Sequence, residues 1–286
     1  MSDASFTPDS RFLQVNGLEL HHLDWGTSGR PPLVLLHGIR LHAHCWSHFS
    51  RAFRGDYHVL ALDARGHGDS GWSEEGHYSL HELYQDLHAI LEERKLGEVT
   101  LIGHSLGART AMLYTHLHPE RVRRLVLVDM GAGLPPTAKP VDFSRYTETP
   151  PPKDFVTHEE AVEYLGGILR LAPRELIEES VRFGMREISN GKFTWKYDPA
   201  LSGPPRSRTG TREWDLWEAV KTIDCPTLLL HGEHSRVVTP EIAQRMASAM
   251  GDCRVELVAQ AGHALFTDQP EAFAKSVKRF LAATHE

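Results

Sequence analysis

The amino-acid sequence predicts an α/β fold, with a mostly parallel central sheet and helices on both of its faces. Short apolar runs of strand length alternate with stretches of helical periodicity, which is the order expected of a parallel sheet. The run from Pro32 to Leu36 is wholly apolar and indicates a strand that is buried on both faces. The length of 286 residues suits one large domain, or one domain with an insertion.

The element order begins with a β-hairpin, because Asn16-Gly17 is the favoured two-residue loop and lies between two strand-like segments. Those segments run from Arg11 to Val15 and from Leu18 to Trp25. The other predicted strands run from Pro32 to Leu36, Tyr57 to Leu62, Val99 to Ile102, Arg124 to Val128, Thr227 to Leu230 and Arg254 to Val258.

Helical signals lie between most of these strands. From Leu80 to Glu93 the apolar residues recur with a period of about 3.6 residues. Thr239 followed by Pro240 is typical of a helix start, with a capping side chain and a proline in the first turn. Pro270 begins the last predicted helix, which runs to about Ala283.

One segment interrupts the alternation, from residue 131 to about residue 215. It is rich in proline at first, and it then shows helical patterns around His158 to Arg170 and Pro173 to Glu187, with no clear central strand. Aromatic residues follow, namely Phe193, Trp195, Tyr197, Trp214 and Trp217. We therefore predict a core domain of residues 1–130 and 216–286. A helical cap of residues 131–215 is inserted after the sixth strand, over the carboxyl edge of the sheet.

Composition and charge exclude several classes of partner. The net charge is −7 and no long run of Lys and Arg occurs, so we expect no nucleic-acid partner. No apolar stretch approaches about 18 residues, so no membrane span is expected. The polar N-terminus argues against a secretory signal, and three scattered cysteines against a disulfide framework. We expect a cytoplasmic protein, a monomer or homodimer, that binds a small-molecule substrate.

Four histidines crowd one segment and raise the question of a metal site. They are His37, His42, His44 and His48. No carboxylate or cysteine lies among them at ligand spacing, and the H-E-x-x-H pattern is absent. We therefore expect surface or pocket-lining histidines, with no metal and no cofactor.

The segment Gly103-His104-Ser105-Leu106-Gly107 lies between an apolar strand and an amphipathic helix. In that context G-x-S-x-G forms a nucleophile elbow, a sharp turn that lifts the serine to the top of a sheet. Small residues are needed on either side, because larger side chains would collide at so tight a turn. The motif predicts that Ser105 is the nucleophile of a serine hydrolase.

Several polar residues follow the predicted strands at their carboxyl ends, where sites gather in open parallel sheets. They are His37, Asp63, Ser105, Asp129, Glu233 and His263. A serine needs a base, and the base needs an acid that orients it. His263 follows the last strand, and Gly262 before it lets the chain turn towards the elbow. We therefore predict that His263 is the base.

An oxyanion hole needs two backbone donors that point at one place. The Leu106 N–H is one candidate, because it lies next to the nucleophile at the start of a helix. The Ile39 N–H is the other, just past His37-Gly38 on the loop after an apolar strand.

The chain resembles the cap-bearing branch of the α/β-hydrolase fold superfamily, over about residues 11 to 283. The resemblance implies the α/β-hydrolase fold, with Ser105 as nucleophile, His263 as base, and Ile39 and Leu106 as oxyanion donors. The segment from Asp63 to Ser70 is usually a structural loop in such proteins, and we assign it no catalysis. The matching motifs are His37-Gly38, residues 63–70 (Asp-Ala-Arg-Gly-His-Gly-Asp-Ser), the elbow at 103–107 and Gly262-His263.

The triad acid departs from the pattern of the relatives. They often place an aspartate three positions after the glycine that follows the seventh strand, where this chain has Ser235. Asp129 at the end of the sixth strand is our preferred acid, since some relatives use a carboxylate from that place. Glu233 is the alternative, although it lies two positions early. Both keep the order of nucleophile, acid and base.

These residues predict cleavage of a small, partly apolar ester or lactone through an acyl-enzyme on Ser105. Dehalogenases and epoxide hydrolases of this fold have an aspartate at the elbow, so those activities are not expected. A C–C bond hydrolase is an alternative, but ring-cleavage relatives commonly carry Asn where this chain has His104. A non-catalytic receptor for a small ligand is a second alternative, favoured by the missing acid after the seventh strand.

Overall fold

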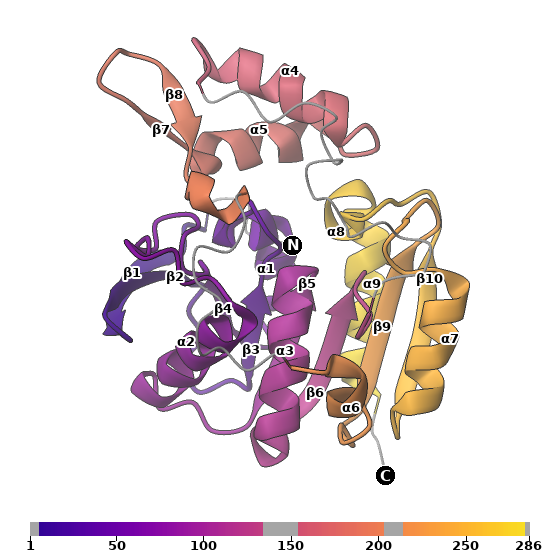
Figure 1. Cartoon of the computed structure of the whole chain (residues 1–286). Helices are drawn as coiled ribbons and strands as arrows, with labels where there is room; N and C mark the ends of the chain where they lie inside the picture. The colour runs from indigo at the N-terminus through magenta and orange to yellow at the C-terminus, as the bar shows by residue number, and fades with distance from the viewer. Residues whose placement is uncertain (1–5, 134–153, 203–213, 284–286) are drawn as a thin grey trace.

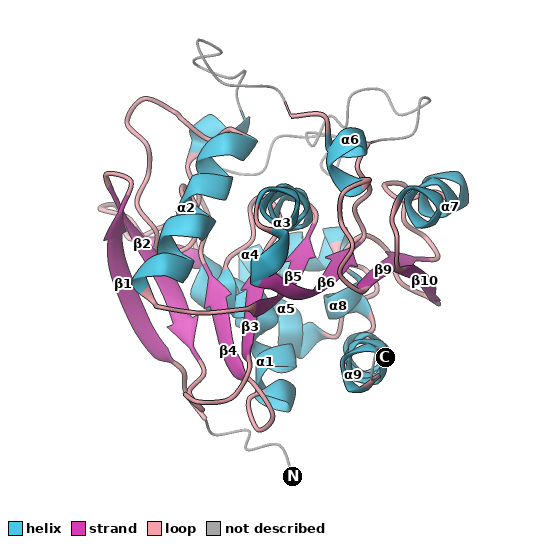
Figure 2. Cartoon of the chain, turned by 90° about the horizontal axis from the view of Figure 1, so that it is seen from below, coloured by secondary structure: helices cyan, strands magenta, loops and turns pink. Residues whose placement is uncertain are grey.

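A single eight-stranded sheet forms the centre of the molecule, with helices on both sides (Figures 1 and 2). The computed structural model describes residues 6–133, 154–202 and 214–283. The strand order across the sheet is β1-β2-β4-β3-β5-β6-β9-β10. The strands are β1 (Asp9–Val15), β2 (Leu18–Asp24), β3 (Pro32–Leu36), β4 (His58–Leu62), β5 (Val99–His104), β6 (Val122–Val128), β9 (Thr227–Gly232) and β10 (Cys253–Val258).

The sheet is mostly parallel, as the sequence predicts. Only the β1–β2 and β2–β4 pairs are antiparallel, and the pairs from β4 to β10 are parallel. The β1–β2 hairpin turns at Asn16 and Gly17, whose φ angles are +51° and +78°. Positive φ at both central residues gives the turn whose twist matches that of the flanking strands, which is why Asn-Gly predicts it.

Two layers of helices cover the two faces of the sheet (Figure 2). One layer contains α2 (Leu80–Glu93), α3 (Leu106–Leu117), α6 (Leu216–Val220) and α7 (Pro240–Ala249). The other contains α1 (Ser47–Phe53), α8 (Leu265–Asp268) and α9 (Pro270–Ala282). Alternate side chains of β3 enter the two cores: Val34 and Leu36 pack under the first layer, Leu33 and Leu35 under the second.

The helix starts follow the capping signals of the sequence. Ser79 caps α2 in a capping box with Glu82, and the Thr239 hydroxyl caps α7 by accepting the Ile242 N–H. These caps satisfy backbone donors that would otherwise lack a partner in the first helical turn.

A separate group of elements lies over the carboxyl ends of the core strands (Figure 1). It contains α4 (His158–Ile168), α5 (Arg174–Gly184) and a small hairpin of β7 (Met185–Glu187) and β8 (Phe193–Trp195). The sequence predicted a helical pattern as far as Glu187, but α5 ends at Gly184 and residues Met185–Glu187 form a strand of this hairpin, which lies outside the central sheet. The hairpin closes at Asn190-Gly191, where Gly191 has a φ of +73°.

The division into a core and a cap of residues 131–215 stays a prediction. Residues 134–153, with most of the early prolines, and residues 203–213 lie outside the described part of the chain. Among the helices that the structure describes, none has both the length and the apolar character needed to cross a bilayer.

Candidate active site

The residues singled out at the strand ends lie along one edge of the sheet. Ser105 follows β5, Asp129 follows β6, Glu233 follows β9, and His263 lies on the loop after β10. The parallel pairing of β5, β6, β9 and β10 places these ends side by side. The sheet topology thus brings together groups that are up to 158 positions apart in the sequence.

Ser105 occupies a strained turn, with φ of +51° and ψ of −112°. This conformation lies outside the regions that side chains normally allow, and such strain is common at functional sites. Gly103 and Gly107 make the turn feasible: a Cβ on Gly103 would clash with the carbonyl of Gly107, and one on Gly107 with the carbonyl of Leu36. The elbow therefore needs glycine at both positions for steric reasons.

Asp129 and His263 form a direct contact at the strand ends. The Asp129 Oδ2 lies 2.6 Å from the His263 Nδ1, and Asp129 is fully buried. A carboxylate only accepts hydrogen bonds, so the Nδ1 atom carries the proton and donates it. In the neutral ring the Nε2 atom is then the proton acceptor, which is the state required of a general base.

Ser235 is a partner of Asp129 that the sequence did not point to. Its Oγ donates to Asp129 Oδ2 over 2.5 Å, and the Gly232 N–H donates to Oδ1 over 3.2 Å. The sequence identified Ser235 only as a residue standing where relatives have an acid. A hydroxyl cannot carry the charge, but it can hold a carboxylate that reaches the same place from β6.

Glu233, the alternative acid, has a different partner. Its Oε2 accepts the backbone N–H of Gln260 over 2.8 Å, and the residue is exposed. This hydrogen bond joins the loop after β9 to the loop after β10. The geometry at His263 therefore favours Asp129 over Glu233.

The two loops that carry the predicted oxyanion donors are joined by a hydrogen bond. The Gly107 N–H donates to the His37 carbonyl over 3.1 Å. Ile39 lies in a turn that is closed by a hydrogen bond from the Leu41 N–H to the Gly38 carbonyl. Arg40, the next residue in this turn, has a φ of +61°. Leu106 is the first residue of α3, so its N–H has no acceptor within the helix.

His104, which precedes Ser105 in the sequence, is buried and contacts the loop that carries His263. Its Nε2 lies 3.0 Å from the carbonyl oxygen of His263, and the two rings are 4.5 Å apart between centroids. Burial lowers the pKa of His104 well below its usual range, so the ring is neutral and its Nε2–H donates. Gly38 packs against the Nδ1 edge of the His104 ring, since a Cβ at position 38 would lie 2.6 Å from His104 Nδ1.

The histidine-rich segment packs against α5 rather than around a shared centre. His42 Nε2 donates to the Ser180 carbonyl over 3.0 Å, and His44 stacks on Phe183 with 3.6 Å between ring centroids. Burial lowers the pKa of His42 to about 4 and that of His44 to about 3, so both are neutral near pH 7.

One group of ligand-type side chains comes together in the described residues, namely His21, Asp63 and Asp69. Asp63 is already engaged by the His21 ring at 2.7 Å and by the Ala43 and Asp69 N–H groups at 2.6 Å and 3.0 Å. Asp69 is paired with Lys196. These contacts make Asp63 a buried anchor for the loops after β3 and β4, and we assign no metal to it.

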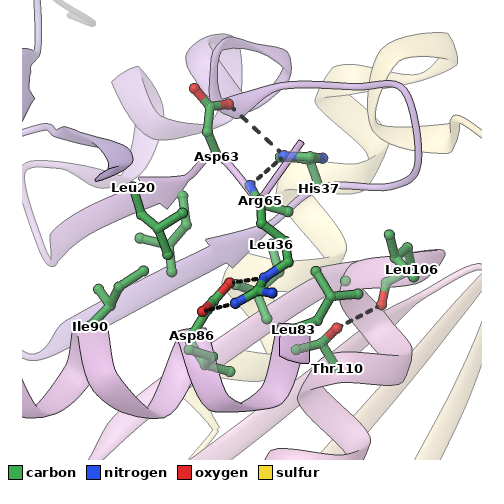
Figure 3. Close-up of a pocket in the computed structure, with 14 residues that line it drawn as sticks. Leu20, Leu36, His37, Asp63, Arg65, Leu83, Asp86, Ile90, Leu106 and Thr110 are labelled. Atoms are coloured by element: carbon green, nitrogen blue, oxygen red, sulfur yellow. Dashed lines mark hydrogen bonds and ion pairs between the residues drawn. The ribbon is translucent and has the colours of Figure 1, made fainter. Parts of the chain in front are cut away.

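A small cavity lies behind the elbow, between the sheet and helices α2 and α3 (Figure 3). It measures about 40 Å³, and Leu106 and Gly107 of the elbow are among the residues that line it. Its walls are mostly apolar apart from a buried ion pair, in which Arg65 binds Asp86 through two hydrogen bonds of 2.6 Å and 2.7 Å. The ion pair joins the loop after β4 to α2.

The aromatic residues that suggested an apolar pocket are used largely for packing. Phe193 and Trp195 join the hydrophobic cluster between α4 and α5. Trp214 and Trp217 pack against the core under α3 and α7. Tyr197 instead pairs through its backbone with His67, next to the core loop that follows β4. The aromatic content of the segment is therefore weak support for an apolar substrate.

Comparison with known proteins agrees with this architecture. The family model "Alpha/beta hydrolase family" matches residues 33–276. The chain is 30% identical over 278 residues to "Esterase Rv0045c" of Mycobacterium tuberculosis, covering 91% of this chain and 85% of that protein. It is 28% identical over 269 residues to the mouse (Mus musculus) "sn-1-specific diacylglycerol lipase ABHD11", covering 90% and 83%.

A solved structure of the same fold aligns over almost the whole chain. The crystal structure of "E-2-(Acetamidomethylene)succinate Hydrolase" has a TM-score of 0.85 and 22% sequence identity, covering 97% of this chain and 100% of that one. At this identity the likeness concerns the fold. The predicted fold and enzyme class are confirmed: the chain belongs to the α/β hydrolase family.

Proposed function

We propose that this protein is a serine hydrolase that cleaves a small carboxylic ester or lactone through an acyl-enzyme on Ser105. The observation that carries the proposal is the contact between His263 and the buried Asp129, beside a serine on a strained elbow. The relatives named as an esterase and a diacylglycerol lipase support ester bonds as the class of substrate.

The proposed reaction follows from the geometry of these groups. His263 Nε2 takes the Ser105 hydroxyl proton as Oγ attacks the substrate carbonyl, and the imidazolium that forms is stabilised by Asp129. The Ile39 and Leu106 N–H groups hold the oxyanion. His263 then returns the proton to the leaving alcohol, and a water activated in the same way releases the acid.

Ser105 Oγ is buried and, within the described residues, has no hydrogen-bond partner. Catalytic hydrogen bonds are often long before substrate binds and tighten in the complex. His104 brings the loops of Ser105 and His263 together, because it is next to Ser105 in the sequence and its ring contacts His263.

The alternative of a non-catalytic receptor rested on the missing acid after the seventh strand. The contact between Asp129, at the end of β6, and His263 supports the catalytic proposal over the receptor. The C–C hydrolase alternative has no observation at the site in its favour, because His104 occupies the position of the asparagine found in ring-cleavage relatives.

The proposal is tested by reaction with a fluorophosphonate probe and with p-nitrophenyl esters of graded chain length. We expect the probe to label Ser105, and Ser105→Ala to abolish both labelling and ester hydrolysis, with a loss on the order of 10⁴-fold or more. Ser248→Ala is the control, because Ser248 is an exposed serine on α7 that bonds only its own helix. Retained hydrolysis in Ser105→Ala would contradict the proposal.

A further inference from the structure

The hydrogen bonds that described residues donate to the Asp129 carboxylate come from elements other than its own. His263 Nδ1 and Ser235 Oγ both donate to Oδ2, at 2.6 Å and 2.5 Å, and the Gly232 N–H donates to Oδ1 at 3.2 Å. Asp129 itself has a φ of +50°, in the left-handed region. The carboxylate therefore crosses from the end of β6 to the loops after β9 and β10.

Ser235 is itself held in place by two hydrogen bonds with nearby backbone groups, so its hydroxyl can restrain the Asp129 carboxylate. Its backbone N–H donates to the Gly232 carbonyl over 3.0 Å, and its Oγ accepts the Val237 N–H over 3.1 Å. Val237 and its neighbour Val238 are buried, which anchors the loop after β9 in the core. With the Val237 N–H as its donor, the hydroxyl has its own proton left to give to Asp129.

We propose that Ser235 is a positioning residue of the active site, whose hydroxyl orients the Asp129 carboxylate towards His263. The proposal rests on the proposed function, because it concerns the same nucleophile, base and acid. Ser235 touches neither the substrate nor Ser105 in this mechanism. It acts by restricting rotation of the carboxylate and by sharing the oxygen that receives the imidazole proton.

The shared oxygen gives the proposal an electrostatic consequence. A hydroxyl that donates to a carboxylate stabilises its negative charge and weakens it as a partner for an imidazolium. Without the Ser235 hydroxyl, the Asp129 carboxylate has one hydrogen-bond donor fewer to stabilise its negative charge. The carboxylate then stabilises the protonated His263 ring more strongly. The acid limb of the pH–rate profile then moves to higher pH, which a purely structural role in the loop would not cause.

The same geometry makes position 235 a second place from which an acid can be supplied. Ser235 Oγ and His263 Nδ1 contact one and the same carboxylate oxygen. An aspartate at 235 extends the side chain by about one bond length beyond Oγ, so we expect its carboxylate to enter the space vacated when the Asp129 side chain is removed.

The first test compares Ser235→Ala with Ser235→Thr, which keeps the hydroxyl. The rate of Ser105 labelling by a fluorophosphonate is measured from pH 5 to pH 9, so no natural substrate is needed. We expect Ser235→Ala to slow labelling about tenfold at neutral pH and to move the acid limb up by about half a pH unit. Ser235→Thr should recover most of both.

A Ser235→Ala protein with the wild-type rate and the wild-type acid limb overturns the proposal, and so does a Ser235→Thr protein that behaves like the alanine variant. Ser248→Ala again serves as the control for serine removal. If the wild-type chain is not labelled at Ser105, the proposed function itself fails. Labelling of the wild type without any effect at position 235 contradicts the positioning role alone.

The second test moves the acid between strands. Asp129→Ala should label about 10³-fold more slowly than the wild type, and Asp129→Ala combined with Ser235→Asp should regain at least about tenfold of that loss. Thermal unfolding of each variant shows that the folded protein is being compared. A folded double variant that is labelled no faster than Asp129→Ala overturns the proposal that position 235 can supply an acid to His263.

Discussion

Two residues of the site, Ser105 and Asp129, have backbone conformations that most side chains avoid. Their φ angles are +51° and +50°. Such conformations cost about 1–3 kcal/mol each and persist only where the surroundings fix them. At Ser105 the surroundings are backbone atoms of the neighbouring glycines and of β3, so one added carbon at the elbow has a large effect.

Gly107→Ala tests this steric requirement. A Cβ at position 107 would lie 2.3 Å from the Leu36 carbonyl oxygen, so the backbone of the elbow or of β3 would have to shift. We expect the variant to lose about 3 kcal/mol of unfolding free energy in urea, together with nearly all labelling of Ser105.

Gly97→Ala is the matched control, because a Cβ at Gly97 meets nothing within 4 Å and its φ is not positive. It should leave both stability and labelling close to the wild-type values. Equal losses in the two variants would show that the elbow has no special need for glycine.

The proposed nucleophile and base stand in short sequence motifs, whereas the proposed acid does not. Ser105 and His263 follow from local patterns, because an elbow and a Gly-His after the last strand are built from neighbouring residues. Asp129 and Glu233 both stand at strand ends, and sequence order fits either one. Which carboxylate faces His263 depends on loops that belong to three different strands.

At the scale of elements, the junction of α2 with the sheet depends on a buried ion pair. Arg65 and Asp86 are both nearly inaccessible and bind through two hydrogen bonds, and Asn16 in the hairpin turn also donates to Asp86. The small cavity beside this pair (Figure 3) leaves little polar surface that could replace a lost partner. Removal of either charged side chain leaves the other buried without a partner of opposite charge.

Asp86→Ala should therefore cost about 3–5 kcal/mol of unfolding free energy, measured by urea denaturation. The double variant Arg65→Met with Asp86→Leu should be more stable than Asp86→Ala, because it leaves no buried charge. Glu93→Ala, at the exposed end of the same helix, should change stability by less than about 0.5 kcal/mol. A double variant less stable than the single one would contradict this account.

Long elements were predictable from periodicity and caps, and very short ones were not. The limits of α2 and β3 agree with the prediction, since each has a full apolar pattern and a clear boundary signal. The β7–β8 hairpin has strands of three residues, too short to show a period of two. Its only local signal was Asn190-Gly191, which lies within a run otherwise read as helix and loop.

At the scale of the whole molecule, buried neutral histidines of the core contact the segment that lies over the strand ends. His42 and His44 contact α5, and His67 pairs with Tyr197. His42, His44 and His67 have pKa values lowered by burial to about 4, 3 and 3. In the unfolded chain a histidine has a pKa of about 6.5. Between these values unfolding takes up protons at the three histidines, so their contribution to stability is fully present above about pH 6.5 and is lost as the pH decreases towards 4.

We expect the unfolding free energy to fall steeply between pH 6.5 and pH 4, with each buried histidine adding up to about 1.4 kcal/mol per pH unit. His42→Gln removes one of these groups and keeps a donor for the Ser180 carbonyl. It should make the dependence shallower in urea titrations at a series of pH values.

His48→Gln is the control for that measurement, since His48 is about half exposed and its only described carboxylate neighbour is a distant Glu271 at 3.9 Å. Its pH dependence should match that of the wild type. A wild-type chain of equal stability at pH 6.5 and pH 4.5 would contradict the link between burial and acid sensitivity.

The sequence by itself determined the order of the core strands, the elbow and the family, because these follow from local sterics, periodicity and hydrogen-bonded caps. Only the tertiary structure decided that Asp129 contacts His263, that Glu233 binds a backbone amide, and that Ser235 faces the carboxylate. These contacts join the ends of separate strands. Their distances depend on how whole loops pack, and no local pattern in the chain contains that information.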